Sequence, residues 1–586
     1  MMNNDKIKLL KDKFNQIIDD NNKIKSRLSY LRLSLFIIGL VFFILYFKNK
    51  DFTIYLAILS TILFIVTSVI HHKYLKIVEN TNYKQTVLKQ YQVRFNDSYR
   101  NSSDSGNDLK SDKYIESDLD LFGKASLFGY LSFAKTPYGR HFLANAIKGN
   151  IISESDLKAR QEAIQELAQD LDQTVDILAQ SIKFSQTESS KKTSNVDNAI
   201  NMLEHETKIN CYKFIISALL TILFIASIIL VVLKKVNSYL PLIIIFVNYF
   251  TSKLIFTDIT KVSKDLNVVN NMFYGYDYLI DSISRKTFKS NLLNDYQAKI
   301  NKLNSKSIKS FNVIANLVST RNNIIFQVLF NGTFLIDGYL LFAYKKWQNK
   351  YQNDFKDAIL SIGHFEELLS LATIQIVKKD TCIPTISNSF EFSDIKHPLI
   401  TEEKCIENSF KFEGTNIITG SNMSGKTTFM RAIGVNYLLF LAGASVNAKE
   451  FSAPISKLFT SMKVVDDVNN NISTFYGEIL RVKAICENMK EDQNMIVLVD
   501  EIFKGTNTLD RITGATEVVN KLIKSNVYAI ITTHDYELCD INGVNNYYFL
   551  EHYEDDKIMF DYKIRKGISN TRNAIYLLKM AGVIDK

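Results

Sequence analysis

The feature that most constrains this chain is a set of four apolar runs arranged in two close pairs. Residues 31–47 and 52–70 form the first pair, and residues 214–233 and 239–256 form the second. A helix needs about 20 largely apolar residues to cross a bilayer, within a range of roughly 17–25. All four runs meet that range, so we expect two helical hairpins that cross a membrane and return the chain to its starting side.

The N-terminal residues predict which side that is. Residues 1–32 hold eight Lys or Arg against four Asp, and such an excess beside an apolar run marks a cytoplasmic flank. A secretory signal peptide is disfavoured, because the basic lead is long, no small-residue cleavage site follows it and a second apolar run comes at once. For the second pair of runs, the alternative of buried core helices stays open.

A fifth apolar stretch, residues 324–344, contains Asn331 and Asp337. A charge within lipid is costly. We therefore expect this stretch to form a helix in a soluble core.

Composition excludes several other classes. Charged residues make up 22% and hydrophobic residues 46% of the 586, which argues against wholesale disorder. Only 5 Pro and 21 Gly occur, which favours long helices over a turn-rich β-sandwich. The five cysteines are widely spaced without a CxxC pair. That pattern argues against a disulfide framework or a zinc site and fits a reducing cytosol.

A glycine-rich segment predicts a phosphate site. Residues 420–427 read GSNMSGKT, after a strand-like segment (415–420, TNIITG) and before a helical pattern. This order is the context that the pattern G-x-x-x-x-G-K-[ST] needs. In such a site the loop N–H groups cradle phosphate, Lys426 reaches the β/γ oxygens and Thr427 holds Mg²⁺. The candidate nucleotide-binding residues of the loop are Gly420, Ser421, Asn422, Met423, Ser424, Gly425, Lys426, Thr427 and Thr428.

Two downstream motifs supply candidate catalytic groups. The apolar segment 495–501 (MIVLVDE) ends in Asp500 and Glu501. Asp500 is suited to bind Mg²⁺ through water, and Glu501 to orient and deprotonate the attacking water. A third strand-like run (VYAIITT) ends before His534, which is placed to contact the γ-phosphate. Taken alone, the acidic pair also fits a solvated strand edge, and His534 a structural histidine.

Together these motifs resemble the ATPase domain of the MutS family of DNA mismatch-repair proteins, a branch of the ABC-type ATPases. The likeness rests on TGSNMSGKTTFMRAIG at 419–434, STFYGE at 473–478, VLVDEIFKGTNTLD at 497–510 and TTHDYEL at 532–538. HPLI at 397–400 precedes these blocks, and KGISNTRNAIYLLKMAGV at 566–583 resembles the closing segment of the family.

The resemblance implies ATP and Mg²⁺ as cofactors and assigns roles by motif. Asn422 and Lys426 would contact phosphate, and Thr427 and Asp500 would serve Mg²⁺. Glu501 would be the catalytic base, with His534 sensing the γ-phosphate and Lys426 supporting the reaction. Ser473 would act in trans on the nucleotide of a partner subunit, which implies a homodimer through the ATPase domains.

Upstream, the likeness is weaker. GKASLFGYLSFAKTPYGRHFLANAI at 123–147 resembles the opening of the family's helical core, and HFEELLSLATIQIVKK at 364–379 its last helix. An apolar hairpin stands where the family has its mismatch-reading domain with a Phe-x-Glu wedge. The second hairpin falls where the family inserts its DNA clamp, and the chain stops soon after AGV. We therefore expect no direct reading of mismatches.

These observations predict a multidomain fold: an α-helical core with transmembrane hairpins, and a C-terminal α/β P-loop ATPase domain of ABC type. The predicted parts are residues 1–110 (basic arm and first hairpin), 111–380 (helical core with the inserted second hairpin) and 381–586 (ATPase domain). The resemblance and the charge pattern together predict a multi-pass protein of the bacterial inner membrane with its ATPase domain in the cytoplasm.

The leading functional hypothesis is an ATP-driven conformational switch whose partners are a second copy, DNA and the lipid bilayer. A lysine-rich stretch at 286–309 is compatible with phosphate contacts, although a solvated helix face explains it more simply. The alternative is an ABC-type ATPase that powers membrane transport or remodelling. The short spacing between Lys426 and Asp500 and the lack of an LSGGQ motif between them disfavour transport. A scaffold that binds ATP without turnover is disfavoured by the pair Asp500–Glu501.

Overall fold

The structure is a computed structural model of the chain. It describes residues 2–568 except 51, 102–103, 112, 187–210, 304, 322, 422, 464–473, 490–494, 504–506, 526 and 555–556. These residues form two compact units. Unit 1 combines Met1–Phe133, Arg140–Val175 and Glu367–Lys586, and unit 2 combines Ala134–Gly139 and Asp176–Glu366. The domains predicted from sequence are continuous stretches divided at residues 110 and 380, whereas each compact unit combines segments that are distant in sequence. The predicted domain division therefore stays a prediction.

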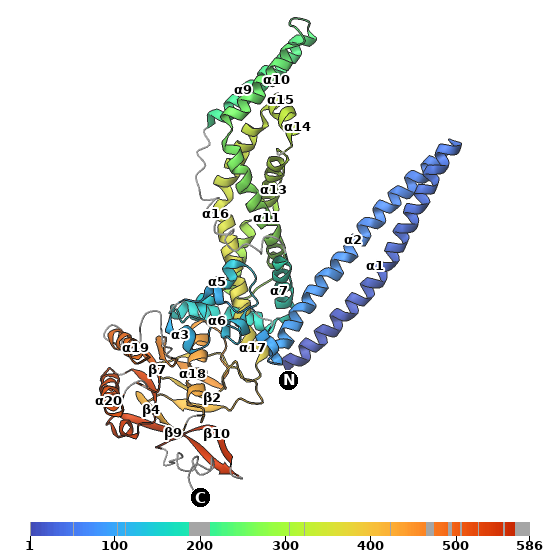
Figure 1. The fold of residues 1–586 in the computed structure, drawn as a ribbon. Helices are drawn as coiled ribbons and strands as arrows, with labels where there is room; N and C mark the ends of the chain where they lie inside the picture. The colour runs from blue at the N-terminus through green and yellow to red at the C-terminus, as the bar shows by residue number, and fades with distance from the viewer. Residues whose placement is uncertain are drawn as a thin grey trace. The chain divides into compact units, whose positions relative to one another are not determined.

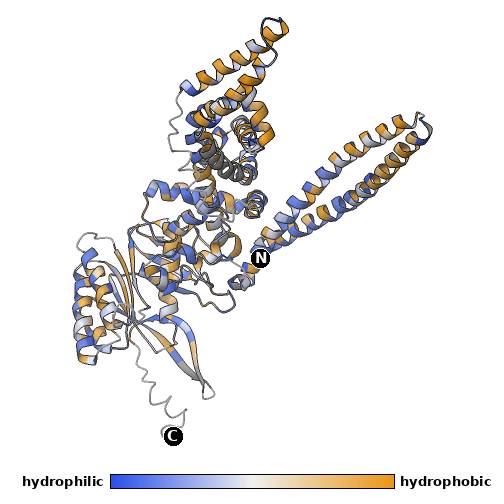
Figure 2. Cartoon of the chain, turned by 45° about the horizontal axis from the view of Figure 1, so that its top comes forward, coloured by the Kyte–Doolittle hydropathy of each residue, from blue (hydrophilic) through white to orange (hydrophobic). Residues whose placement is uncertain are grey.

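Unit 1 begins with a long helical hairpin, α1 (Met2–Asn49) and α2 (Thr53–Phe95), which stands out in Figure 1. The two helices pack along each other, and Ser60 Oγ donates a hydrogen bond to the Leu35 carbonyl oxygen at 2.6 Å. Figure 2 shows apolar residues concentrated toward the connected end of this hairpin. At the other end Arg94 is buried and donates to the carbonyl oxygens of Tyr130 (2.5 Å) and Ser132 (2.8 Å). These bonds fix the base of α2 in the body of unit 1.

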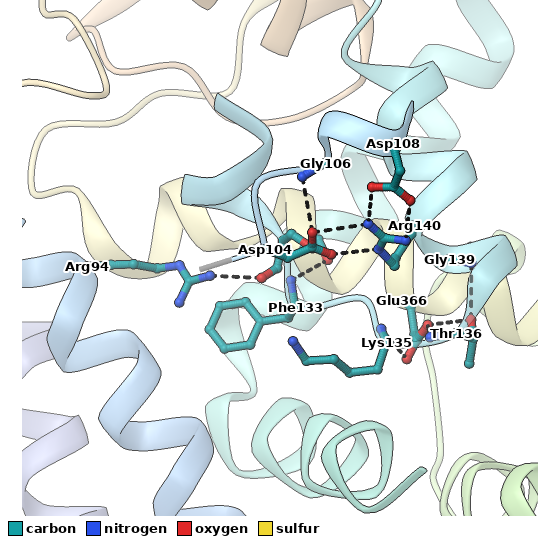
Figure 3. A network of polar contacts seen from close by, with 12 residues as sticks. Arg94, Asp104, Gly106, Asp108, Phe133, Lys135, Thr136, Gly139, Arg140 and Glu366 are labelled. Atoms are coloured by element: carbon teal, nitrogen blue, oxygen red, sulfur yellow. Dashed lines mark hydrogen bonds and ion pairs between the residues drawn. The ribbon is translucent and has the colours of Figure 1, made fainter. Parts of the chain in front are cut away.

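Short helical elements follow the hairpin along the chain: η1 (Ser98–Asn101), η2 (Asn107–Leu109), α3 (Tyr114–Asp118), α4 (Leu127–Leu131), α5 (Pro137–Ala146), α6 (Glu154–Gln169) and α7 (Leu171–Ser185). Arg140 holds part of this region together through ion pairs to Asp104 (2.6 Å) and Asp108 (2.8 Å) (Figure 3). The hydrogen bonds from Arg140 lower the pKa of Asp108.

The C-terminal part of unit 1 contains two β-sheets. A six-stranded sheet has the order β10-β9-β4-β8-β7-β6, in which only β10 is antiparallel to its neighbour. A four-stranded sheet has the order β1-β5-β2-β3. The strands are β1 (Thr385–Ile386), β2 (Glu391–Ile395), β3 (Asn408–Lys411), β4 (Thr415–Thr419), β5 (Glu450–Ala453), β6 (Lys457–Ser461), β7 (Met495–Asp500), β8 (Tyr528–Thr532), β9 (Val544–Glu554) and β10 (Lys557–Lys566).

Helices cover the six-stranded sheet, and every residue of its strands β4 and β7 is buried. The helices of this part are α17 (Thr373–Val377), α18 (Lys426–Leu441), α19 (Thr474–Asn488), α20 (Thr508–Lys524) and η6 (Tyr536–Asp540). α19 and α20 share one core with β4, β7 and β8. α18 contacts β7 and β8, and its Phe429 and Tyr437 also pack against Phe392 and Phe390 of the four-stranded sheet region. The helix that starts at Lys426 is therefore held between the two sheets.

Unit 2 is helical in the residues that the structure describes. Its helices are α9 (Cys211–Val232), α10 (Leu240–Ile255), α11 (Asp258–Ser284), α12 (Asn291–Lys302), α13 (Ser305–Thr320), α14 (Ile324–Phe326), the π-helical turn η4 (Gln327–Asn331), α15 (Gly332–Phe334) and α16 (Ile336–Leu371). Near the end of α16, the Glu366 carboxylate accepts hydrogen bonds from the backbone N–H groups of Lys135 (3.2 Å) and Thr136 (2.9 Å) (Figure 3). Burial raises the pKa of Glu366.

The predicted apolar runs map onto helices. Three described helices are long and apolar enough to cross a membrane: Asn4–Lys48, Thr53–Phe95 and Tyr212–Val232. α10, which holds the fourth run, has 16 residues and falls just short of the usual length of a span. Crossing of a bilayer by any of them stays a prediction.

The prediction of one helix over residues 324–344 is wrong. The stretch is broken at Leu335, whose φ of 45° is left-handed, and the two helical parts meet at 88°. The side chain of Asn331 accepts a hydrogen bond from the Asp337 N–H at 3.0 Å, which caps the new helix α16. The polar residues that we took as signs of a buried helix instead form its break.

Candidate active site at the edge of the six-stranded sheet

The glycine-rich loop joins β4 to α18 at the carboxyl edge of the parallel strands. Gly420 (φ 145°) and Gly425 (φ 103°) both have backbone conformations that L side chains rarely adopt. A Cβ at Gly420 would lie 3.0 Å from the Phe549 carbonyl oxygen, and one at Gly425 would lie 3.0 Å from the ring of Tyr562. Both glycines are therefore required by the path of the loop and by its close neighbours on β9 and β10.

Lys426, the first residue of α18, is buried and turns back over this loop. Its Nζ donates hydrogen bonds to the carbonyl oxygens of Gly420 (2.7 Å) and Ser421 (2.9 Å). Ser421 Oγ in turn donates to the carboxylate of Glu551 on β9. The ammonium group thus lies within the curve of the loop.

Thr427 and Asp500 lie next to each other, as the motif spacing predicts. Thr427 Oγ1 donates to Asp500 Oδ2 at 2.8 Å, and Thr532 Oγ1, at the end of β8, donates to Asp500 Oδ1 at 2.6 Å. Parallel pairing of β7 with β8 brings Asp500 opposite Thr532. The two hydroxyl groups hold the carboxylate at the sheet edge beside the start of α18.

Glu501 and His534 form a second polar pair at this edge. His534 Nε2 lies 3.1 Å from Glu501 Oε1. The backbone of Glu501 is left-handed (φ 50°), and its N–H donates to both oxygens of Thr532, at 3.0 and 3.1 Å. A non-glycine residue in this conformation is strained, and here its carboxylate lies against His534, which follows the end of β8.

Several predicted site residues are not tested by these contacts. Asn422 and Ser473 lie outside the described residues, as do residues 569–583 of the predicted closing segment. Ser424 Oγ is buried without a hydrogen-bond partner in the part of the chain that the structure describes. Met423 is exposed at the tip of the loop, and Thr428 faces an adjacent cavity.

That cavity, of about 510 Å³, lies beside the loop, and sequence reasoning missed it. It is lined by Ile395, His397, Ile400, Lys404, Cys405, Ile406, Asn408, Gly425, Thr428, Phe429, Ala432, Phe549 and Tyr562. Asn408 shapes one wall, because its amide donates to the Tyr562 carbonyl oxygen (2.9 Å) and accepts from the Ile564 N–H (2.8 Å). These bonds occur where the pairing of β9 and β10 shifts register and Tyr562 is left-handed. No local motif announces this bulge, so the sequence carried no usable signal for it.

The side chain of His397 is uncharged at neutral pH. Burial and the nearby Arg431 and Lys378 lower its pKa to about 4. Its Nδ1 accepts a hydrogen bond from the Leu399 N–H at 3.2 Å. The cavity wall beside the loop therefore presents a neutral imidazole.

A buried ion-pair network braces the two helices that flank the site. Asp118, at the end of α3, is fully buried and pairs with Arg481 of α19 at 3.1 Å. Asp120 pairs with Arg431 of α18 at 2.9 Å and with Lys463 at 2.6 Å. Asp118 and Asp120, which follow one another closely on the chain, thus connect to both α18 and α19.

The oxygen donors at this edge suit Mg²⁺ better than they suit a metal ion held entirely by protein side chains. No group of three or more His, Cys, Asp or Glu suited to a metal was found among the described residues. Thr427 and Asp500 instead offer two oxygen ligands beside the loop. Mg²⁺ typically keeps several waters and takes its other ligands from substrate phosphates and one or two carboxylates.

The class that fold and site define is a helical protein with a C-terminal α/β region, in which a glycine-rich loop meets paired carboxylates at the end of a parallel strand. The family described as MutS domain V matches residues 416–586. The chain is 32% identical over 250 residues to the DNA mismatch repair protein MutS of Leptospira interrogans, covering 39% of this chain and 29% of that protein. It is 28% identical over 247 residues to MutS of Thermotoga maritima (39% and 31%) and 29% identical over 240 residues to human MutS protein homolog 4 (38% and 25%).

Through this C-terminal region, the chain belongs to the MutS family. It covers less than a third of the length of each of these curated relatives.

Proposed function

We propose that this chain is a membrane-anchored MutS-type ATPase that acts as an ATP-driven conformational switch. One observation carries the proposal. Three separate segments bring the Lys426 loop, the Thr427–Asp500 contact and the Glu501–His534 pair to the same edge of a parallel sheet. Ligands of open α/β sheets bind outside the carboxyl ends of the strands.

The loop and Lys426 bind the phosphates of ATP. The N–H groups at the start of α18 point toward the loop, where the helix dipole favours an anion. Lys426 at present donates to two carbonyl oxygens of its own loop. These bonds are replaced by stronger, charge-assisted bonds to the β/γ-phosphate oxygens when the triphosphate binds. The adjacent cavity beside Tyr562 has the size expected for the nucleoside.

Thr427 and Asp500 hold Mg²⁺, with the Thr427 hydroxyl as a direct ligand and Asp500 acting through water. When bound, the ion offsets the charge of the phosphate oxygens. Thr532 keeps Asp500 oriented by donating to its other oxygen.

Glu501 orients the attacking water and accepts its proton. His534 contacts the Glu501 carboxylate, so it keeps this base in place and lies where it can respond to the γ-phosphate. A positioned general base contributes roughly 10²–10⁴-fold to a rate.

The anchor is formed by α1, α2 and the hairpin of α9 and α10, in a bacterial inner membrane with the ATPase region in the cytoplasm. Support comes from the basic residues before the first apolar run and from the exposed apolar side chains of α1, α2, α9 and α10. A cysteine at Asn237, between α9 and α10, should react with a membrane-impermeant reagent added outside intact cells. Protection of that cysteine would contradict this topology.

A second copy of this chain and DNA are the proposed partners. The relatives named DNA mismatch repair protein support DNA as the ligand. We do not extend the proposal to direct reading of mismatches. Binding of DNA by the detergent-solubilised protein should weaken steeply with salt, and binding that is absent or insensitive to salt would remove DNA from the proposal.

Lys426→Ala tests the ATPase. Loss of a hydrogen bond to a charged group costs about 1.5–3 kcal/mol, so nucleotide affinity should fall roughly 10–100-fold and turnover should be lost. Lys411→Ala is the matched control, because Lys411 is an exposed lysine on β3 outside the loop. Equal activity of the two variants would show that the loop is not the site.

A further inference from the structure

The broken segment α14–η4–α15 carries an unusual amount of exposed apolar surface. Ile324, Ile325 and Leu329 are 72%, 67% and 56% exposed, and Phe330 and Phe334 are also exposed. No Asp, Glu, Lys, Arg or His occurs between Arg321 and Asp337. Soluble surfaces rarely expose contiguous apolar patches of this kind without a binding role.

This surface continues that of the hairpin α9–α10, whose apolar residues are visible in Figure 2. α15 packs on both α9 and α10. A Cβ at Gly332 would lie 2.7 Å from the Ile245 side chain, and the ring centroids of Phe224 and Phe334 are 6.2 Å apart. Asn248, within α10, donates to the Gly332 carbonyl oxygen at 3.0 Å. The segment is thus an integral part of the apolar end of unit 2.

The ends of the segment are held together. Arg321 Nε, just before it, pairs with Asp337 Oδ2, just after it, at 2.9 Å. Ser252 Oγ donates to the same carboxylate oxygen at 3.2 Å. A segment that leaves and returns at one ion pair cannot cross a bilayer, and its longest helical part, Ile324–Phe334, is too short to span about 30 Å.

The segment also satisfies its own backbone where it bends. Thr221 Oγ1 of α9 donates to the Phe334 carbonyl oxygen at 2.9 Å, and Asn331 accepts from the Asp337 N–H. Irregular backbone is tolerated at membrane depth only when neighbouring helices satisfy it. Here Thr221 of α9, Asn248 of α10 and Asn331 of the segment itself provide the hydrogen bonds.

We propose that residues 323–335 insert into the bilayer beside α9 and α10 without crossing it, as a third lipid-contacting element of unit 2. The inference rests on the proposed membrane anchoring and adds an element that the four apolar runs do not include. The chemistry that binds this surface is that of lipid acyl chains, because Gly332 and Phe334 lie beside the middle of α10 and α9. Arg321 and Asp337 mark where the segment enters and leaves.

Quenching by brominated lipids tests the inference in the full chain reconstituted into vesicles. Trp347 is the only tryptophan and is buried, so the unmodified protein serves as the blank. Phe330→Trp, with Leu329→Trp as a second variant, places a probe on the segment. Ile222→Trp on α9 is the positive control. Val313→Trp on α13 is the matched exposed control, because Val313 is 58% exposed in the same unit.

We expect the added emission of Phe330→Trp and Leu329→Trp to be quenched by brominated lipids, as that of Ile222→Trp is. Val313→Trp should not be quenched. Quenching of Ile222→Trp alone would overturn this inference and leave the membrane anchor intact. Absence of quenching at Ile222 as well would overturn the anchor itself.

Discussion

Two polar pairs, one in each unit, involve or lie near non-glycine residues with left-handed backbone conformations (Glu501 and Leu335), yet the two pairs differ in access to solvent. In the Glu501–His534 pair the side chains are 24% and 43% exposed, whereas in the Arg321–Asp337 pair they are 12% and 0% exposed. The first pair is therefore open to a ligand. The second pair is enclosed, so its interaction can only stabilise the fold.

The partners of the carboxylates explain this difference. Glu501 faces the His534 imidazole, whose Nε2 lies 3.1 Å from Glu501 Oε1. Asp337 faces an arginine, which stays charged, and a serine hydroxyl. Under the proposed function, similar chemistry therefore serves catalysis at an open sheet edge and fold specification at an enclosed helix break.

The largest effect is expected from Glu501→Gln, which should break the open pair chemically and leave the fold intact. Glutamine keeps the shape and can still bond a water, but it cannot accept a proton. ATP turnover should fall roughly 10²–10⁴-fold, while ATP affinity should be retained because Lys426, Thr427 and Asp500 are unchanged. Steady-state hydrolysis and equilibrium nucleotide binding measure the two effects. Normal hydrolysis would show that Glu501 is not the base.

The same variant should accumulate the ATP-bound state, which we propose is a dimer. Size analysis in detergent with saturating ATP should show a dimer for Glu501→Gln and a monomer when Ser473→Arg is added. A monomer in the absence of Ser473→Arg would contradict the facing-pair arrangement while leaving the assignment of the base untouched.

The open pair was the easier one to predict from sequence, because its residues stand in contiguous motifs. A buried strand that ends in Asp500–Glu501 and a strand that ends before His534 meet at one edge once the strands are parallel neighbours. The contact between Thr427 and Asp500 follows from the same logic. What these residues do stays a prediction.

The remaining features depend on contacts between distant segments, which one sequence does not display. Tyr562 reaches Gly425 only because a register shift in β10 turns it inward. Asp118 reaches Arg481 across 363 positions. The sequence alone does not show that Asp337 pairs with Arg321, because the two meet only where the chain folds back at Leu335. Without that partner, Asp337 indicated a soluble helix.

Asp337→Asn should break the enclosed pair and affect stability without affecting chemistry. Removal of one partner from a buried ion pair leaves the other charge uncompensated, at a cost of about 3–5 kcal/mol. Trp347 reports on this unit, because it is buried in α16 and donates to the Ser307 carbonyl oxygen at 2.9 Å. Denaturant unfolding in detergent, followed by Trp347 emission, should shift to lower denaturant.

The double variant Arg321→Gln with Asp337→Asn is the control, because it removes both charges. It should recover part of the loss, whereas ATP hydrolysis should stay unchanged in both variants. If the single variant were as stable as the unmodified protein, the pair would not hold the break.

The smallest expected effect concerns His397, in the wall of the cavity beside the loop. Burial, Arg431 and Lys378 lower its pKa from 6.5 to about 4, and only Asp120 opposes them. The unfolded chain therefore takes up a proton between pH 6.5 and 4 that the folded chain does not, so this contribution to stability is complete above pH 6.5 and is lost as the pH falls. Acidification from pH 7 to 5 should lower the free energy of unfolding by about 1–2 kcal/mol through this residue.

His397→Asn tests this contribution, because Asn keeps an acceptor for the Leu399 N–H but does not titrate. The free energy of unfolding of the C-terminal region, measured in urea by proteolysis at each pH, should depend less on pH in this variant by that amount. Equal pH dependence in both proteins would mean that His397 is protonated as readily in the folded chain as in the unfolded one, and that the cavity wall is as open as the edge that carries Glu501 and His534.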